Sequence, residues 1–177
     1  MTTGHDDRSA CLDFVVREQP FVIRFLLRLG ASAADAEDAA QEATIQAWRL
    51  AESGFWGDVH EPRGWIRKVA LRHLNRPRGR RRSVVEIPMV DIPEPRAASA
   101  EGPEFTAETV SIVATLSGLP QQEGIAVALK MDGLTSAETG AFLGVSDQRA
   151  RDLLKRARKR LRRQFASQDG TDDGRTS

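Results

Sequence analysis

The chain has 177 residues and a net charge of +1, and 40% of its residues are hydrophobic, 29% charged and 6% aromatic. This composition is typical of a globular protein and excludes a disordered chain, and the length suits one domain or two small ones. The single cysteine, Cys11, excludes an internal disulfide framework and a Cys-rich zinc site, so a reducing cytoplasm is the expected setting.

The net charge hides a strong segregation along the chain. Residues 72–82 contain six arginines and no acidic residue, whereas residues 31–42 carry acidic charges only. The local charge of each stretch therefore indicates more about binding partners than the net charge of the whole chain does. The N-terminus is polar and acidic, without a basic segment followed by an apolar one, and the most apolar run is interrupted by Arg24 and Arg28. Neither export nor membrane insertion is expected.

The first predicted element is helical. Apolar residues recur at helical spacing from Leu12 to Leu29, and Gly30 ends the pattern. Because Pro20 lies inside this segment, it is either one kinked helix or two consecutive helices.

Two further helices are predicted before a proline-rich segment. One follows Ser32 and runs to about Leu50, with a stripe of alanines that permits close helix packing. The next starts near Arg63 and is stopped by Pro77. Residues 83–105 are rich in proline and show no sustained period, which is typical of an extended, flexible linker. The sequence thus predicts an all-α chain of two small helical domains.

The last part of the chain predicts a helix-turn-helix. Helical patterning resumes near Thr106, and Pro120 marks the start of another helix. Thr135 and Glu138 have the spacing of a capping box, and Gly144 suits the left-handed turn that ends the short helix. Ser146 can cap the final helix, which has one apolar face, whereas arginines and lysines crowd the rest of its surface.

A basic helix after a tight turn fits the major groove of DNA. Residues early in such a helix reach base edges, and bidentate arginine contacts to guanine are the commonest specific contacts, so Gln148, Arg149 and Arg151 are the reading candidates. Residues beyond about Arg158 are expected to meet phosphates or solvent. A solvated basic helix that only packs by its leucines is the alternative, since charge runs often serve solubility alone.

Three segments resemble one known family. Residues 133–163 resemble region 4 of the extracytoplasmic-function (ECF) sigma factors, the promoter-specificity subunits of bacterial RNA polymerase, residues 35–48 resemble their region 2.2, and residues 62–76 resemble their regions 2.3 and 2.4. The resemblance implies an initiation factor without enzymatic activity, metal or cofactor. It implies region 2 at residues 10–82, a linker at 83–105, region 4 at 106–166 and a disordered tail at 167–177.

The resemblance also implies partners and contact residues. The partners are core RNA polymerase, through its clamp helices and flap, and promoter DNA, which is duplex at the −35 element and single-stranded at the −10 element. An anti-sigma protein or the expression level would control the activity. The implied polymerase contacts are Asp38, Gln41 and Glu42, which share one helical face opposite the alanines. The implied −10 contacts are Trp65, Lys68, Arg72, His73, Asn75, Arg76 and Arg80, and the −35 contacts are Gln148, Arg149, Arg151, Asp152, Lys155 and Arg156.

Several tryptophans have a competing structural interpretation. Trp65 is expected to pack the helices of region 2 rather than to meet a base, because a large aromatic side chain dominates a small core. Trp48 and Trp56 are likewise interpreted as packing residues. Within the helix-turn-helix, Thr139 and Gly140 replace residues that are usually Ile and Ala in the family, which predicts a less stable first helix.

Other classes of function fit less of the chain. An enzyme has little support, because there is no Gly-rich phosphate loop and the three histidines lack the spacing of metal ligands. A stand-alone helix-turn-helix regulator accounts for the basic helix but requires an effector or dimerisation domain at residues 12–82. A protein that binds polymerase without initiating fits the acidic face at Asp38 but leaves the basic helix unused.

Overall fold

The structure is a computed structural model, and it describes residues 3–76 and 107–169. Every regular element within these ranges is helical, which confirms the all-α prediction. The elements are α1 (Thr3–Arg28), α2 (Ala33–Glu52), the short 3-10 helix η1 (Trp56–Asp58), α3 (Pro62–Leu74), α4 (Ala107–Ser117), α5 (Gln121–Met131), α6 (Ser136–Leu143) and α7 (Asp147–Asp169). None of these helices is long and apolar enough to cross a membrane.

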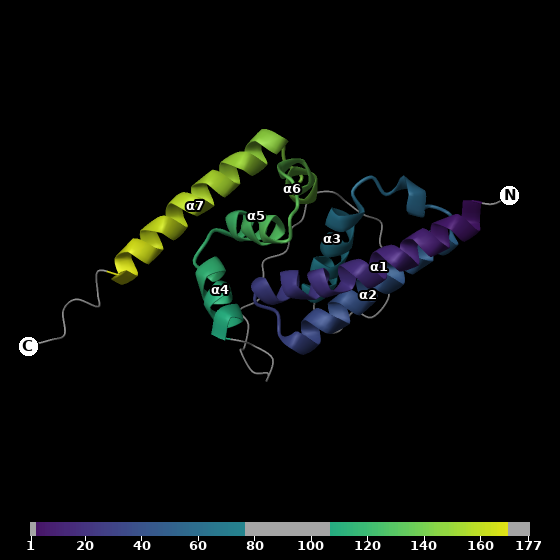
Figure 1. Cartoon of the computed structure of the whole chain (residues 1–177), viewed down its shortest axis with the longest axis horizontal. Coiled ribbons are helices and arrows are strands. Elements are labelled where there is room, and N and C mark those ends of the chain that lie inside the picture. The colour runs from purple at the N-terminus through teal and green to yellow at the C-terminus, as the bar shows by residue number, and fades with distance from the viewer. Residues whose placement is uncertain (1–2, 77–106, 170–177) are drawn as a thin grey trace, which may run out of the picture.

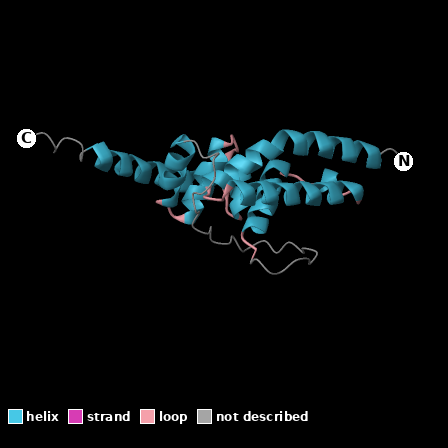
Figure 2. Ribbon diagram, turned by 90° about the horizontal axis from the view of Figure 1, so that it is seen from below, coloured by secondary structure: helices cyan, strands magenta, loops and turns pink. Residues whose placement is uncertain are grey.

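The helices form two units that pack against each other. In the N-terminal unit, α1 and α2 lie side by side and α3 packs across them; in the C-terminal unit, α5 and α6 pack against the long helix α7 (Figures 1 and 2). The units meet where α3 contacts α6 and where α1 contacts α4 and α5. The buried apolar side chains of both units form one continuous cluster. The predicted linker at residues 83–105 lies outside the described residues.

Helix α1 is a single helix that continues through Pro20. Proline lacks the N–H that would bond the carbonyl four residues earlier, which here belongs to Val16. Both Pro20 and Val16 are exposed, so water can reach the carbonyl that the proline leaves unpaired. The sequence left two alternatives for this segment. Because α1 is continuous from Thr3 to Arg28, the prediction of two consecutive helices was wrong. The helix also begins at Thr3, nine residues before the apolar pattern that indicated it.

Local signals place helix α2 and its buried face. Ser32 is the N-cap, and its hydroxyl accepts a hydrogen bond of 3.2 Å from the backbone N–H of Asp35. The predicted alanine stripe is buried against the rest of the unit and consists of Ala36, Ala39, Ala40, Ala43, Ala47 and Ala51. Because alanine is small, α1 and α3 can both approach α2 closely, which leaves the opposite face of α2 for partners.

Aromatic side chains fill the core beneath η1. Trp56 is buried and lies with its ring centroid 5.2 Å from that of Phe14 and 6.1 Å from that of Trp65. The structural interpretation of Trp56 and Trp65 is therefore confirmed by their packing. Trp48 differs, because it is an exposed residue of α2 and does not belong to the core. Its interpretation as a packing residue was wrong, although its helical spacing from Asp38 and Gln41 places it on the exposed side of α2.

The helix-turn-helix forms as its signals predict. Thr135 and Glu138 make the reciprocal hydrogen bonds of a capping box, Gly144 ends α6 with a φ of 68°, and the hydroxyl of Ser146 accepts from the backbone N–H of Arg149. Thr139 is fully buried, and its hydroxyl donates to the carbonyl of Thr135 at 2.8 Å. The hydroxyls of Thr135 and Ser146 thus accept from backbone N–H groups that the starts of α6 and α7 would leave unpaired.

Gly140 is required by close packing rather than tolerated as a weak helix former. A Cβ added there would lie 2.8 Å from the backbone carbonyl oxygen of Val145. We expect Gly140→Ala to lower the free energy of unfolding by about 1–3 kcal/mol, since backbone must move to make room. Gly64→Ala is the matched control, because a Cβ in α3 meets only an ordinary contact at 4.0 Å. Urea unfolding followed by circular dichroism compares the two, and equal stability of both variants would contradict the expectation.

The final helix is longer than the sequence indicated. A disordered tail was predicted from residue 167, whereas α7 continues to Asp169. Residues 170–177, the rest of that prediction, lie outside the described residues. The sequence did not predict this extension, because the residues after Phe165 carry no apolar periodicity and the helix continues beyond its packed face.

Candidate protein- and nucleic-acid-binding surfaces

Helix α2 presents a continuous polar face away from the core. Asp38 and Gln41 are exposed and Glu42 is half-buried, at spacings of three and four residues that place them on one side of the helix. Within the described residues, the amide of Gln46 approaches the carboxylate of Glu42 at 3.4 Å. These side chains are not needed to hold the helix in place, so they are available for a basic partner.

Two apolar side chains extend this face and were not among the predicted contacts. Ile45 and Trp48 follow Asp38 by seven and ten residues, and each is 37% exposed. Large aromatic residues are enriched in the central part of protein interfaces, and polar residues form the rim around them. The signal was present in the sequence as the same helical spacing that groups Asp38 with Gln41. We refer to Asp38, Gln41, Glu42, Ile45 and Trp48 together as the α2 face.

The α2 face meets helix α3 at one edge. Nε2 of His73 lies 3.2 Å from Oδ2 of Asp38, although His73 was predicted on the DNA side and Asp38 on the polymerase side. The Asp38 side chain is 76% exposed, so this contact contributes little to stability. The contact shows that the predicted polymerase-binding surface on α2 and the predicted DNA-binding surface on α3 are adjacent.

Helix α3 gathers most of the predicted −10 contacts on one side. Trp65, Lys68 and Arg72 follow one another at three- or four-residue spacing in α3, and Arg76 lies just beyond the C-cap of this helix; all four are half-buried. Burial lowers the pKa of Lys68, and the neighbouring Arg72 lowers it further. Burial and Arg72 thus disfavour the charged form of Lys68, and a bound phosphate would favour it.

Two of the predicted −10 contacts, Asn75 and Arg80, are not placed in this patch. Asn75 is the C-cap of α3, and its side-chain amide donates to the carbonyl of Leu71 at 2.9 Å, so part of its hydrogen-bonding capacity closes the helix. Arg80 lies outside the described residues. The structure therefore brings together Trp65, Lys68, Arg72 and Arg76, with His73 beside them. Asn75 instead caps the C-terminal end of α3.

The predicted −35 contacts lie on the outer side of α7. The apolar face of this helix is buried, with Ala150 and Ala157 fully so, whereas five of the six candidates are exposed and Asp152 is half-buried. The exposed candidates are Gln148, Arg149, Arg151, Lys155 and Arg156. An exposed basic side opposite a packed apolar one is the arrangement that a groove-binding helix requires.

Side chains in the first turns of α7 hold one another. Arg151 pairs with Asp147 at 2.6 Å and donates to Gln148 at 3.1 Å, and Gln148 donates to Asp152 at 3.3 Å. Arg149 takes no part in these side-chain contacts and is exposed. Asp152 thus acts within this chain of contacts, which explains how an acidic residue is accommodated on a basic helix.

A buried carboxylate anchors the middle of α7. Glu123 of α5 is only 4% exposed and lies 3.6 Å from the guanidinium of Arg156 and 3.1 Å from that of Arg160. Arg156 was predicted as a −35 contact, and the structure places its charge toward α5. Sequence reasoning missed Glu123, because nothing in its local pattern distinguishes an acidic residue in a first helical turn from an ordinary favourable charge at a helix start.

The arrangement of these surfaces defines a class of protein. It is an α-helical DNA-binding protein with a helix-turn-helix in one unit and an exposed acidic and apolar face in the other. Within the described residues, no group of three or more His, Cys, Asp or Glu side chains is placed to hold a metal ion.

Comparison with known proteins identifies the family. Residues 14–83 match the family model of sigma-70 region 2, and residues 109–161 match that of sigma-70 region 4. The chain is 31% identical over 147 residues to the ECF RNA polymerase sigma factor SigF of Caulobacter vibrioides, covering 82% of this chain and 79% of that protein. It is 26% identical over 161 residues to the RNA polymerase sigma-E factor of Streptomyces coelicolor, covering 89% and 86%.

A solved structure shares the fold. CnrH, solved in complex with the cytosolic domain of CnrY, aligns with a TM-score of 0.67 at 17% identity over 93% of this chain and 96% of that one. The sequence matches show that the chain belongs to the ECF sigma factors of bacterial RNA polymerase.

Proposed function

We infer that this chain binds core RNA polymerase and directs it to specific promoters, without catalysing a reaction itself. The observation that carries the inference is the presence of both sigma regions in one chain, in family order. A stand-alone regulator would have no use for the exposed α2 face, and a polymerase-binding protein that does not initiate would have no use for the basic side of α7.

The division of labour between the surfaces is part of the proposal. The α2 face binds the clamp helices of core polymerase through Asp38, Gln41 and Glu42, and Ile45 and Trp48 add apolar contact. The basic side of α3 binds the −10 element after its strands separate, because Lys68 and Arg72 offer cations next to an aromatic cluster. The first turns of α7 read the −35 element as duplex, while the C-terminal unit docks on the polymerase flap.

Control of this activity comes from a separate anti-sigma protein or from the expression level. Support for a protein regulator is limited to the fold shared with CnrH, which was solved with the cytosolic domain of CnrY bound.

Reconstituted transcription tests the proposed function. Purified chain is combined with bacterial core polymerase and a library of genomic promoter fragments, and the transcripts are sequenced. We expect transcripts from a limited set of promoters that share −10 and −35 sequences, and none from core polymerase alone. If every template stays silent while the chain alone protects duplex DNA tightly, the regulator is the correct class.

A further inference from the structure

Glu123 is a carboxylate in the first turn of α5 that is buried against the basic helix α7. Its side chain is 6% exposed, and its two oxygens lie 3.6 Å from Nε of Arg156 and 3.1 Å from Nε of Arg160. A buried carboxylate needs charged partners, because its removal from water is costly. Within the described residues both partners come from α7, so the carboxylate and the orientation of the two arginines depend on each other.

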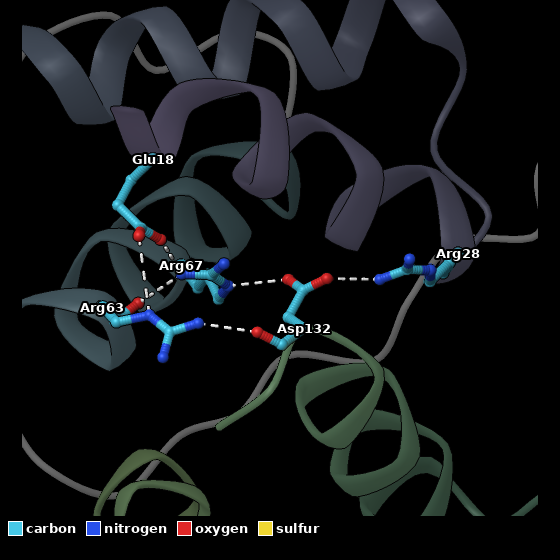
Figure 3. A network of polar contacts seen from close by, with 5 residues as sticks. All are labelled: Glu18, Arg28, Arg63, Arg67 and Asp132. Atoms are coloured by element: carbon cyan, nitrogen blue, oxygen red, sulfur yellow. Dashed lines mark hydrogen bonds and ion pairs between the residues drawn. The ribbon is translucent and has the colours of Figure 1, made fainter. Parts of the chain in front are cut away.

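The surroundings of Glu123 differ from those of Asp132, a second buried carboxylate of the C-terminal unit. Figure 3 shows Asp132 among arginines of the N-terminal unit, and one of them, Arg67, is fully buried at 2.9 Å. Charges enclosed in this way act on the packing of helices. The side chains of Arg156 and Arg160 are instead 43% and 55% exposed, so the pairing at Glu123 extends from the core to the surface of α7.

The contacts with Glu123 engage the inner nitrogen of each guanidinium. Both ion pairs are made by Nε, and Oε2 of Glu123 has no aligned hydrogen bond within the described residues. The outer nitrogens of Arg156 and Arg160 therefore keep their donors for another acceptor. Because a guanidinium is planar, holding Nε also restricts the plane in which the outer donors point. A phosphate is an acceptor that a pair of such donors fits.

The basic residues of α7 form two rows along the helix. Arg149, Arg156 and Arg160 are separated by seven and four positions, which at about 100° per residue places them within about 40° of one another. Since two of them pair with Glu123, this row lies on the side of α5. The other row lies on the opposite flank of the buried apolar face and consists of Arg151, Lys155, Arg158 and Arg162.

We propose that Glu123 is a positioning residue for DNA binding, which holds Arg156 and Arg160 so that they bind backbone phosphates on the α5 side of α7. The proposal rests on the proposed function in taking this DNA to be the −35 element. Phosphate contacts fix the register and orientation of a protein on the duplex, whereas base contacts carry the sequence information. Glu123 thus acts through the two arginines on how Arg149, in the same row, meets a base.

A bracing role alone predicts a different result. If Glu123 only held α7 on α5, loss of its charge would lower the free energy of unfolding and weaken the binding of every DNA sequence alike. A positioning role predicts that discrimination between sequences falls while the general attraction for DNA does not. The two roles are therefore separated by measuring discrimination and general affinity in the same variant.

The principal test is Glu123→Gln, which removes the charge and keeps the size of the side chain. We expect the holoenzyme to lose discrimination between −35 sequences by about fivefold or more, measured by transcription from a randomised −35 library. The full-length variant should bind duplex DNA of random sequence about threefold more tightly at low salt, measured by fluorescence anisotropy, because a negative charge beside the basic surface is gone. Glu52→Gln makes the same change at an exposed position of α2 and should alter neither quantity.

Two results with Glu123→Gln would overturn the proposal. One is a folded variant with unchanged discrimination between −35 sequences. The other is equal loss of affinity for all sequences, which is the result of bracing alone.

A second variant keeps the charges and removes the planar geometry. Arg156→Lys combined with Arg160→Lys should reduce discrimination as Glu123→Gln does, while the salt dependence of binding to random duplex stays the same. Adding Glu123→Gln should cause no further loss, since the carboxylate acts through these two side chains. Both are about half exposed, so this variant decides the question if Glu123→Gln loses helix content by circular dichroism. Full discrimination in the folded lysine variant would contradict the positioning role.

Alanine variants distinguish this proposal from the proposed function. Arg156→Ala and Arg160→Ala should each reduce the salt slope by about one when the full-length chain binds random duplex, a measurement that requires no polymerase. An unchanged slope, or loss of preference at a base pair that Arg149→Ala leaves intact, would overturn the assignment of these arginines to phosphates. If the slopes fall as expected but the holoenzyme initiates at no promoter, the proposed function fails while the phosphate contacts stand.

Discussion

Reversing the charge of Asp38 and Glu42 to Lys should weaken binding to core RNA polymerase by about a hundredfold or more, because like charges placed against each other at an interface cost several kcal/mol. The double variant Asp38→Lys with Glu42→Lys should keep its helix content, since both side chains lie opposite the buried alanines of α2. Fluorescence anisotropy with labelled chain and core polymerase measures the affinity, and circular dichroism measures the helix content.

The effect should be specific to the α2 face. Asp13→Lys combined with Asp58→Lys produces the same change in net charge at exposed positions outside α2, and it should leave core affinity within about threefold of the parent. The Asp38–His73 contact is exposed, so its loss does not explain a large effect. Unfolding of the α2 double variant, or equal loss of affinity in the control, would show that this face is wrongly assigned.

Local signals in the sequence were sufficient to predict helix ends, where a side chain or a glycine acts on the backbone of residues close to it in the sequence. Ser32 caps α2, the Thr135–Glu138 box starts α6, and Gly144 ends it in the left-handed conformation, each as predicted. These outcomes depend on residues three or four positions apart, which a single sequence displays directly. Helical periodicity likewise predicted the buried faces of α2 and α7.

Contacts between distant residues could not be predicted in this way. Arg67 and Asp132 are 65 residues apart, and neither has a local pattern that marks it as buried. An arginine between Ile66 and the buried Val69 was an available signal, because it stands on the apolar side of α3 where a charge requires a partner. The sequence does not specify which of the chain's many acidic residues that partner is. That choice depends on how the two units pack.

The contacts among side chains of α7 refine which residue reads DNA. Arg151 is held by Asp147 and Gln148, so it enters the groove with a restricted orientation but must release or share these partners to bind a base. Exposed pairs of this kind contribute little, so the release is inexpensive. Arg149 is exposed three residues after the Ser146 cap, in the first turn of α7. To contact a base edge, Arg151 must therefore give up or share its contacts with Asp147 and Gln148, whereas Arg149 has no such contacts to release.

The last prediction assigns base reading to the start of α7 and general attraction to its later turns. Arg149→Ala and Arg151→Ala should each cost ~1 to 3 kcal/mol on the preferred −35 sequence and flatten the preference at one or two base pairs. Lys159→Ala and Arg163→Ala should weaken all sequences alike and reduce the salt slope by about one per lost phosphate contact. Transcription from a randomised −35 library with each single variant provides the measurement. Because Lys159 and Arg163 lie two or more turns beyond the cap, a change of base preference in Lys159→Ala, together with uniform loss in the Arg149 and Arg151 variants, would move the reading surface further along α7.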